Sequence, residues 1–208
     1  MNKRGILIVV SGFSGAGKGT LMKALQKKYD DCALSISATT RKPRDGEVDG
    51  KEYFFKSIEE FEKMIANDEL IEYARYVENY YGTPHAYVEE QLNAGKDVIL
   101  EIELQGALKV REKYPEALLV FVTPPSAEEL KRRLVNRGTE TIEVIESRLK
   151  RAVEEAKGMH EYDYLVVNDD LDTCVDEMHN IFKSEHNKSF RNKAFISKIQ
   201  QELKALNE

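Results

Sequence analysis

A glycine-rich segment that ends in lysine most constrains what this chain can fold into. The segment reads GFSGAGKGT at residues 12–20, directly after the apolar run at residues 6–10 and before a helical pattern at residues 21–28. A buried strand followed by glycines, a lysine and a helix is the layout of a phosphate-binding P-loop. Its backbone N–H groups, the helix N-terminus and Lys18 all favour an anion. The pattern therefore predicts a nucleoside triphosphate site. The residues expected to hold the triphosphate are Gly12, Phe13, Ser14, Gly15, Ala16, Gly17, Lys18, Gly19 and Thr20.

The position after the lysine departs from the common pattern. Ser or Thr normally stands there and coordinates Mg²⁺ through its hydroxyl, whereas this chain has Gly19, with Thr20 one position later. Two interpretations remain: a P-loop whose metal is held by water or another side chain, or a glycine-rich turn without a ligand. The spaced glycines and lysine between an apolar strand and a helix favour the first.

The composition favours a soluble globular protein and excludes several other classes. Of 208 residues, 41% are hydrophobic and 33% charged, and the net charge of −6 argues against coating nucleic acid. The two cysteines, Cys32 and Cys174, and the four histidines lack the spacing of a disulfide framework or a zinc site. No apolar run approaches the ~18 residues of a membrane span, and the run at residues 6–10 is too short for a signal peptide. We expect a cytosolic protein with no nucleic-acid or membrane partner.

Apolar runs alternate with helical patterns along most of the chain. The runs lie at residues 6–10, 98–102, 118–122 and 164–167. Strands that alternate with helices predict parallel pairing and an α/β core, with ligands at the carboxyl ends of the strands. A capping box at residues 126–129 predicts a helix to residue 135, and Thr141 is expected to cap a helix to about residue 157.

Three segments fall outside this alternation. Residues 37–93 combine a charged loop at 41–47, strands at 53–55 and 70–77 and a helix at 58–66, which predicts a small α+β insertion. An arginine-rich turn at residues 133–148 is a second candidate insertion. The tail at residues 185–208 carries Phe195, Ile199, Leu203 and Leu206 on one helical stripe. We expect this helix to pack on its own domain in a monomer, with pairing in a homodimer as the alternative.

Several further motifs occur in the order of a known family. They lie at residues 37–44, 46–47, 50–53, 79–83, 105–106, 137–140 and 168–170. Together with residues 12–20, they resemble the guanylate kinase family from about residue 5 to residue 183. The resemblance implies a P-loop nucleoside monophosphate kinase fold, with a parallel sheet core flanked by helices, a small α+β GMP-binding insertion and an arginine-rich lid. We expect the core at residues 1–36, 94–136 and 158–184, the insertion at 37–93, the lid region at 137–157 and the C-terminal helix or tail at 185–208.

The resemblance also implies a reaction and roles for particular residues. ATP would donate its γ-phosphoryl group to GMP or dGMP, with Mg²⁺ as cofactor. At matching positions, the family binds the phosphate of GMP with Arg41, Arg44, Tyr53 and Tyr81. It reads guanine with Ser37, Glu72 and Thr83. The residues expected to act in catalysis are Lys18, Arg41, Arg133, Arg137 and Arg148. Asn168 matches the adenine contact.

The residue types suit these roles. Guanidinium groups and phenols can grip a phosphate, and solvated loop charge is the alternative for Arg41 and Arg44. An ionised Glu72 accepts hydrogen bonds from guanine N1–H and its amine, whereas adenine N1 is itself an acceptor, a mismatch of roughly 1–3 kcal/mol. A surface glutamate is the alternative for Glu72. The attacking phosphate, with a second pKa of about 6, needs no general base, so arginine charge should supply most of the catalysis.

Two glutamates depart from the family pattern. Glu101 and Glu103 stand where many members have aspartates. Glu103 is still expected to contact GMP and Glu101 to act on Mg²⁺ through water, so no residue is predicted to bind the metal directly. The rival functions are a guanylate-kinase-like interaction module and a kinase for another nucleoside monophosphate. The presence of Lys18 and Arg41 disfavours the module, and the guanine-reading set disfavours the other kinase.

Overall fold

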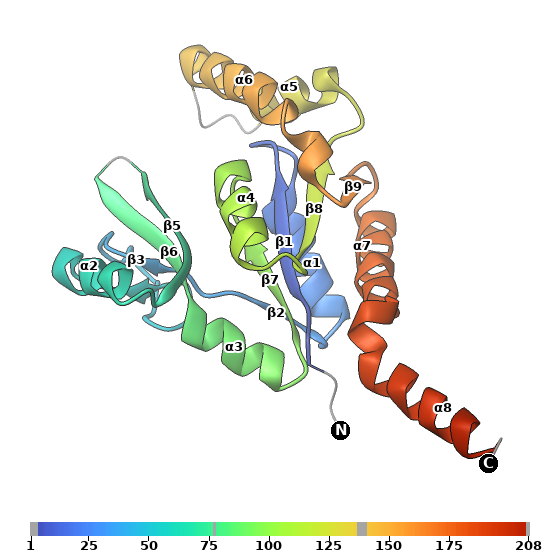
Figure 1. Cartoon of the computed structure of the whole chain (residues 1–208). Coiled ribbons are helices and arrows are strands. Elements are labelled where there is room, and N and C mark those ends of the chain that lie inside the picture. Colours follow the sequence, from blue (N-terminus) through green and yellow to red (C-terminus); the bar gives the residue numbers. More distant parts are fainter. Residues whose placement is uncertain (1–3, 77, 137–140, 207–208) are drawn as a thin grey trace.

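A parallel sheet forms the centre of the molecule (Figure 1). The structure is a computed structural model that describes residues 4–76, 78–136 and 141–206. Within these residues, the central sheet has five strands in the order β2-β7-β1-β8-β9, and every neighbouring pair is parallel. The strands are β1 (Leu7–Gly12), β2 (Cys32–Leu34), β7 (Asp97–Glu101), β8 (Leu118–Thr123) and β9 (Tyr164–Val167). The predicted α/β class is confirmed, and β1 lies in the middle of the sheet, where the connections diverge to either side.

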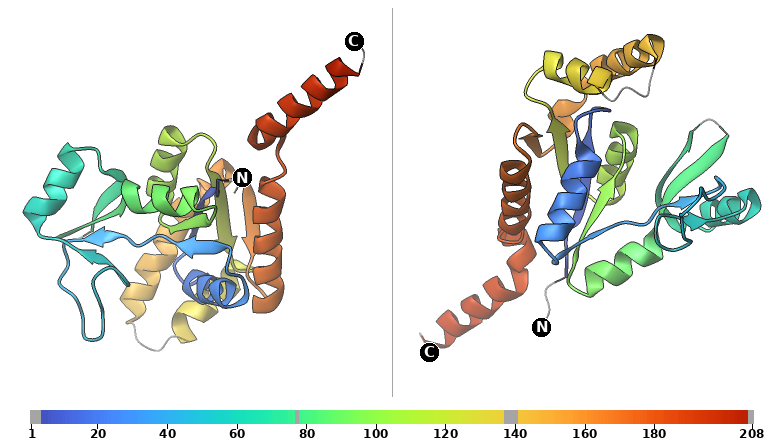
Figure 2. Two further views of the ribbon diagram at one scale, coloured as in Figure 1. Left: turned by 90° about the horizontal axis from the view of Figure 1, so that it is seen from below. Right: turned by 180° about the vertical axis from the view of Figure 1, so that it is seen from behind.

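Helices cover both faces of this sheet, which is why its strands are continuous apolar runs. On one face α1 (Lys18–Lys28) packs against α7 (Leu171–Glu185), and on the other α3 (His85–Asn93) and α4 (Leu104–Lys113) contact β7 and β1 (Figure 2). Ile8, Val9 and Val10 of β1 are accordingly fully buried. The four predicted strands are all confirmed, with ends displaced by at most two residues.

A second, mixed sheet stands beside the core. Its order is β4-β3-β6-β5, with β3 (Ala38–Thr39) parallel to β4 (Phe54–Phe55) and antiparallel to β6 (Asn79–Pro84), which pairs with β5 (Leu70–Tyr76). The helix α2 (Ile58–Ala66) begins with a capping box, in which the Glu60 N–H donates to Ser57 Oγ and the Ser57 N–H donates to Glu60 Oε2. Phe61 on α2 is fully buried and stacks on Tyr80. A small α+β unit is therefore present in the predicted segment.

The arginine-rich segment contributes two helices above the carboxyl ends of the strands (Figure 1). They are α5 (Ala127–Asn136) and α6 (Ile142–Ala156), and a short helix η1 (Met159–Glu161) follows before β9. The Glu129 N–H donates to Ser126 Oγ at 3.1 Å, which confirms the predicted N-terminus of α5. Thr141 is at the N-cap of α6, as predicted, although its side chain makes no capping hydrogen bond.

The C-terminal helix differs from the prediction. After the turn η2 (Ser189–Asn192), α8 (Lys193–Ala205) projects away from the body of the molecule (Figures 1 and 2). Phe195 is 63% exposed and Leu206 is 80% exposed. The predicted amphipathic helix is confirmed, but the expectation that its stripe packs on its own domain is wrong. None of the helices formed by residues 4–76, 78–136 and 141–206 is long and apolar enough to cross a membrane.

Candidate active site

The glycine-rich loop between β1 and α1 encloses a hollow of about 380 Å³. We call it the loop hollow, and its lining includes Ser14, Gly17, Lys18, Thr20 and Glu101. Gly17 has a φ of +89°, and a Cβ there would lie 2.5 Å from the Asn168 side-chain nitrogen. That nitrogen donates to the Ala16 carbonyl at 2.8 Å. Glycine is therefore required at residue 17, and Asn168, at the end of β9, ties the loop to the edge of the sheet.

Lys18 lies over the loop that precedes it. Its Nζ donates to the carbonyl of Gly12 at 2.6 Å and to that of Phe13 at 3.2 Å. An ammonium group held there stands beside the backbone N–H groups of the loop and the N-terminus of α1, where an anion is most favoured. The side chain of Thr20 is exposed and lines the same hollow, while nothing lies within 4 Å of a Cβ at Gly19.

Two of the predicted arginines contact the loop, one from α5 and one from α6. Arg148 on α6 donates to Ser14 Oγ at 2.7 Å. Arg133 on α5 pairs with Glu129 at 2.6 Å and donates to the Ala16 carbonyl at 3.4 Å. Arg137 lies outside the described residues. The structure thus brings Lys18, Arg133 and Arg148 together around the loop although they come from three helices.

A second hollow, of about 320 Å³, opens between the mixed sheet and the core. We call it the sheet hollow, and its lining includes Ser37, Tyr53, Glu72, Tyr81 and Gly106. Glu72 is 8% exposed, and Gly106 leaves room for its carboxylate, because a Cβ at Gly106 would lie 3.3 Å from Glu72 Oε2. Burial raises the pKa of Glu72 from its ordinary value, although the hydrogen bond from Thr83 and the charge of Lys109 oppose this shift.

Thr83 holds the carboxylate of Glu72 in position by a hydrogen bond. Its hydroxyl donates to Glu72 Oε1 at 2.8 Å, and Thr83 itself is fully buried. The sequence analysis assigned Ser37 and Thr83 to the same task, but only Ser37 lines the sheet hollow among these two. The geometry therefore assigns Thr83 to holding the carboxylate in place.

Arg41, Tyr53 and Tyr81 gather at one end of the mixed sheet. The rings of Tyr53 and Tyr81 lie 6.1 Å apart, and the Arg41 guanidinium lies 5.3 Å from the centre of the Tyr53 ring. Arg41 forms a bidentate pair with Glu47, with both N–O distances at 2.9 Å. The guanidinium lowers the pKa of Glu47, which also accepts the backbone N–H of Arg44. The side chain of Arg44 is exposed in the loop.

The sequence analysis gave Glu47 no role, although it quoted the segment. The spacing of six residues from Arg41 carries no periodic signal, because both residues lie in a loop rather than on a helix or strand. Only the folded loop brings the two side chains together.

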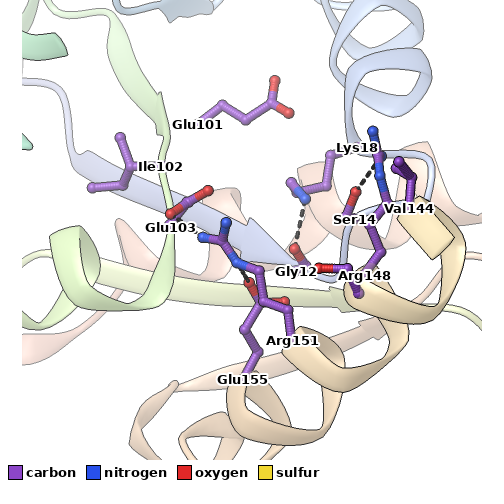
Figure 3. Close-up of a pocket in the computed structure, with 11 residues that line it drawn as sticks. Gly12, Ser14, Lys18, Glu101, Ile102, Glu103, Val144, Arg148, Arg151 and Glu155 are labelled. Carbon is purple, nitrogen blue, oxygen red and sulfur yellow. Dashed lines mark hydrogen bonds and ion pairs between the residues drawn. The ribbon is translucent and has the colours of Figure 1, made fainter. Parts of the chain in front are cut away.

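A central hollow of about 520 Å³ shares lining residues with each of the other two. Lys18, Glu101 and Glu103 line one side, and the inward face of α6 lines the other. Figure 3 shows Arg148 and Arg151 extending from α6 toward the loop and toward Glu103, respectively. Glu101, at the end of β7, lines all three hollows. One carboxylate therefore stands where the two nucleotide sites would meet.

Arg151 and Glu155 are further residues that the sequence analysis missed. Arg151 forms an ion pair with Glu103 and another, at 3.0 Å, with Glu155. Burial raises the pKa of Glu155, while Arg151 opposes that shift. Helical spacing could have found both, because they follow Arg148 by three and seven residues and so share its face.

The donor set suits a magnesium ion that arrives with a nucleotide. In the described part of the chain, no three His, Cys, Asp or Glu side chains gather to hold a metal. Mg²⁺ commonly keeps several waters and is held by one or two carboxylates together with substrate phosphates. The carboxylate of Glu101 and the hydroxyl of Thr20 are oxygen donors that line the loop hollow beside Lys18. These residues fit such an ion.

Known proteins resemble the chain over nearly its whole length. A family model described as guanylate kinase matches residues 4–185. The guanylate kinase of Caldanaerobacter subterraneus is 52% identical over 202 residues, which are 97% of this chain and 98% of that protein. That of Bacillus subtilis is 54% identical over 192 residues, 92% of this chain and 94% of the relative. The crystal structure of guanylate kinase from Anaplasma phagocytophilum matches with a TM-score of 0.71 at 34% identity, covering 91% of this chain and 90% of that one.

Proposed function

The chain belongs to the guanylate kinase family, and from that premise we propose which of its residues carry out the phosphorylation of GMP. The protein is a nucleoside monophosphate kinase with the P-loop fold, and its substrates are ATP and GMP. The observation that supports the assignment of residues is the shared wall at Glu101, with Lys18 on one side and the buried Glu72 on the other. The sheet hollow then takes GMP and the loop hollow takes the phosphates of ATP.

Guanine binds against Glu72. The ionised carboxylate accepts guanine N1–H and the exocyclic amine, while Thr83 holds one of its oxygens. Ser37 donates its hydroxyl to guanine O6, an acceptor that adenine lacks. Glu103, at the edge of the same hollow, contacts the nucleotide as well. None of these groups is assigned to the ribose 2′-hydroxyl, so dGMP is a second acceptor.

The phosphate of GMP binds at the cluster of Arg41, Tyr53 and Tyr81. Arg41 offers a planar fork that suits phosphate oxygens, and the two phenols donate further hydrogen bonds. Arg44 reaches the phosphate from its exposed position when the loop closes over the ligand. The loop from residue 41 to residue 47 is then the clamp of the acceptor, because it carries both arginines.

Catalysis rests on cations placed around the transferred group. An oxygen of the GMP phosphate attacks the γ-phosphorus of ATP, the bond to the β,γ-bridging oxygen breaks, and ADP leaves with that electron pair. Lys18 and the loop amides hold the β- and γ-phosphates, and Arg133, Arg137 and Arg148 stabilise the charge that spreads over the transferred oxygens. Mg²⁺ would neutralise charge on the phosphates of ATP when bound, and Glu101 would hold it through water.

Three further assignments, of the adenine contact, of closure and of location, complete the proposal. Asn168, whose side-chain nitrogen donates to the Ala16 carbonyl in the glycine-rich loop, is the residue that we assign to the adenine of ATP, as the family resemblance implies. The insertion at residues 37–93 and the lid region at residues 137–157 move as units over the core when both nucleotides bind, which keeps water from the reacting phosphates. Cys32 and Cys174 are buried free thiols, which supports a cytoplasmic location because thiols stay reduced there.

The test is ADP formation with GMP, dGMP, AMP and UMP as acceptors, using the full chain and its Lys18→Ala variant. We expect turnover with GMP and dGMP, and a fall in kcat of roughly 10²–10³-fold in the variant, the range for loss of one preorganised charge at a transition state. Lys27→Ala, which removes an exposed lysine from the last turn of the same helix, serves as the control. Activity of Lys18→Ala at the control's level would contradict the phosphate site, and no turnover with any acceptor would favour an interaction module.

A further inference from the structure

The central hollow contains a guanidinium group to which the proposed mechanism gives no role. Arg151 follows Arg148 by three residues on α6, and both side chains line this hollow. In Figure 3 the side chain of Arg148 extends toward the glycine-rich loop, whereas that of Arg151 extends toward Glu103. One face of the lid helix therefore directs one arginine toward the proposed donor site and another toward the proposed acceptor site.

Glu155 fixes the direction of the Arg151 side chain. It lies one turn later on α6, its side chain is 16% exposed, and its Oε1 accepts a hydrogen bond from Arg151 Nε at 3.0 Å. Because Nε stands at the base of the guanidinium, this bond leaves the terminal nitrogens at the far end of the side chain. One of these, Nη2, donates to Glu103 Oε2. Glu155 thus orients Arg151 across the hollow.

Glu103 marks the place that Arg151 reaches. It is the N-cap residue of α4, and the preceding Ile102 carbonyl accepts a hydrogen bond from Ser11 Oγ of β1 at 2.7 Å, which holds this segment against the sheet. Glu103 lines both the central hollow and the sheet hollow. The terminal end of Arg151 therefore stands where these two hollows share a wall, and a phosphate that extends from the sheet hollow toward ATP has to pass there.

The charges around the central hollow give Arg151 a task. Among the described residues that line it, three cations face three carboxylates: Lys18, Arg148, Arg151, Glu101, Glu103 and Glu155. A phosphate monoester carries close to two negative charges at neutral pH. Without Arg151, the carboxylates would outnumber the cations where two phosphates must meet. The ion pair with Glu103 is exposed and therefore weak, so a phosphate, which matches the guanidinium fork in two places, can replace that carboxylate.

We propose that Arg151 binds the phosphate of GMP from the lid helix, in addition to the clamp at residues 41–47, and that it releases Glu103 when it does so. This inference rests on the proposed function, in which the sheet hollow takes GMP. The released Glu103 then accepts a hydrogen bond from the nucleoside in the hollow that it already lines. Because Arg148 lies one turn earlier on the same helix, a phosphate held at Arg151 also keeps Arg148 at the loop.

The first test compares Arg151→Gln with the unmodified full chain in steady-state ADP formation. We expect the KM for GMP to rise roughly tenfold, the low end for loss of a hydrogen bond to a charged group because the side chain is 45% exposed, and the KM for ATP to stay unchanged. Arg151→Lys keeps the charge and loses the planar fork, so its KM for GMP should lie between the two. Lys150→Gln, which removes an exposed cation from the preceding position of α6, is the control and should match the unmodified chain.

The second test separates contact with the phosphate from a purely structural role. Guanosine competes with GMP for the sheet hollow but has no phosphate, so its inhibition constant reports on the nucleoside alone. Arg151→Gln should leave this constant unchanged. Glu103→Gln, which alters a group assigned to the nucleoside, should raise the inhibition constant of guanosine together with the KM for GMP.

The outcomes distinguish this inference from the proposed function. An unchanged KM for GMP in Arg151→Gln, an equal rise in the KM for ATP, or an equal rise in the inhibition constant of guanosine would overturn the role of Arg151 while GMP phosphorylation by the unmodified chain still stands. If the unmodified chain fails to phosphorylate GMP, the proposed function falls and this inference falls with it. The exposed ion pair contributes little to stability, so Arg151→Gln should keep the Tm of the unmodified chain, and Arg151→Lys provides a second measurement of the same contact.

Discussion

Replacement of Glu72 by glutamine tests the proposed recognition of guanine and changes the volume of the side chain very little. The amide has nearly the volume of the carboxylate, and its oxygen can still accept the hydrogen bond that Thr83 donates at 2.8 Å. What changes is the second oxygen, next to Gly106, which becomes an NH₂ donor. That donor faces the N1–H and amine of guanine, so an acceptor and a negative charge are lost where the proposed ligand presents only donors.

The structure sets the size of the effect. Glu72 is 8% exposed, so water does not replace the lost acceptor, and a hydrogen bond to a charged group contributes about 1.5–3 kcal/mol. One such bond corresponds to a fall in kcat/KM for GMP of roughly 10–150-fold. Adenine loses nothing equivalent. The preference for GMP over AMP should therefore narrow by the same factor.

Because the pKa of Glu72 is raised, the stability of Glu72→Gln relative to the unmodified protein should depend on pH. Since burial raises the pKa above the ordinary 4.5, the folded state holds the proton more tightly than the unfolded chain. The stability contributed by the protonated group is present below the unfolded pKa and is lost as pH rises through the folded pKa. Glutamine never ionises, so at neutral pH Glu72→Gln should be at least as stable as the unmodified protein, and this advantage should disappear in acid.

The assay is steady-state ADP formation with GMP and AMP, together with Tm as a function of pH. Glu69→Gln, which changes an exposed glutamate next to the same strand, is the matched control and should alter neither quantity. An unchanged ratio of GMP to AMP activity in Glu72→Gln would refute the reasoning about the base. A loss of Tm at neutral pH would refute the reasoning about burial.

Three other predictions concern the lid and the thiols. Arg148→Met should lower kcat at saturating substrates by roughly 10²–10³-fold because it removes a cation from the central hollow beside the glycine-rich loop, and a change below threefold would contradict its role. The side chains of Arg151 and Glu103 are 45% and 67% exposed, so loss of their ion pair should change the free energy of unfolding by less than about 1 kcal/mol. Glu103→Gln should nevertheless raise the KM for GMP, and an unchanged KM would remove Glu103 from the acceptor site. Burial raises the pKa of the Cys174 thiol to about 11, so the native protein should not react with a thiol reagent at pH 8 until it is denatured.

Apolar and aromatic composition, more than length, decided which strands could be predicted, because the two-residue β4 lies in the strand predicted at residues 53–55 whereas the six-residue β6 was not predicted. The run that became β1 is apolar on both faces over a whole strand, because helices cover both sides of the sheet, and β9 was placed at its true ends. In contrast, β2 has three residues and β3 has two, too few for any periodicity to stand out from a loop. These short strands are set by their partners in the sheet rather than by their own residues.

Site residues on helices and strands were easier to predict from the sequence than those in loops. Glu72 and Arg148 were named from their positions in the family resemblance. In the structure Glu72 lines the sheet hollow and Arg148 lines the central hollow, and their roles stay predictions. The bond from Thr83 to Glu72 needed the actual pairing of β5 with β6, because it crosses between strands. The direction of α8 depended on hydrogen bonds in a four-residue turn, which no stripe on the helix reveals.

The pair between Arg41 and Glu47 means that the proposed phosphate clamp already holds a carboxylate before any nucleotide binds. Binding of a phosphate at Arg41 is then an exchange of one anion for another, not the filling of a bare charge. The affinity measured for a phosphate at Arg41 is then the difference between its binding to Arg41 and the binding of the Glu47 carboxylate that it displaces. Glu47 keeps the Arg41 guanidinium in place when no ligand is bound, and only an anion that binds Arg41 more strongly than Glu47 does can displace it.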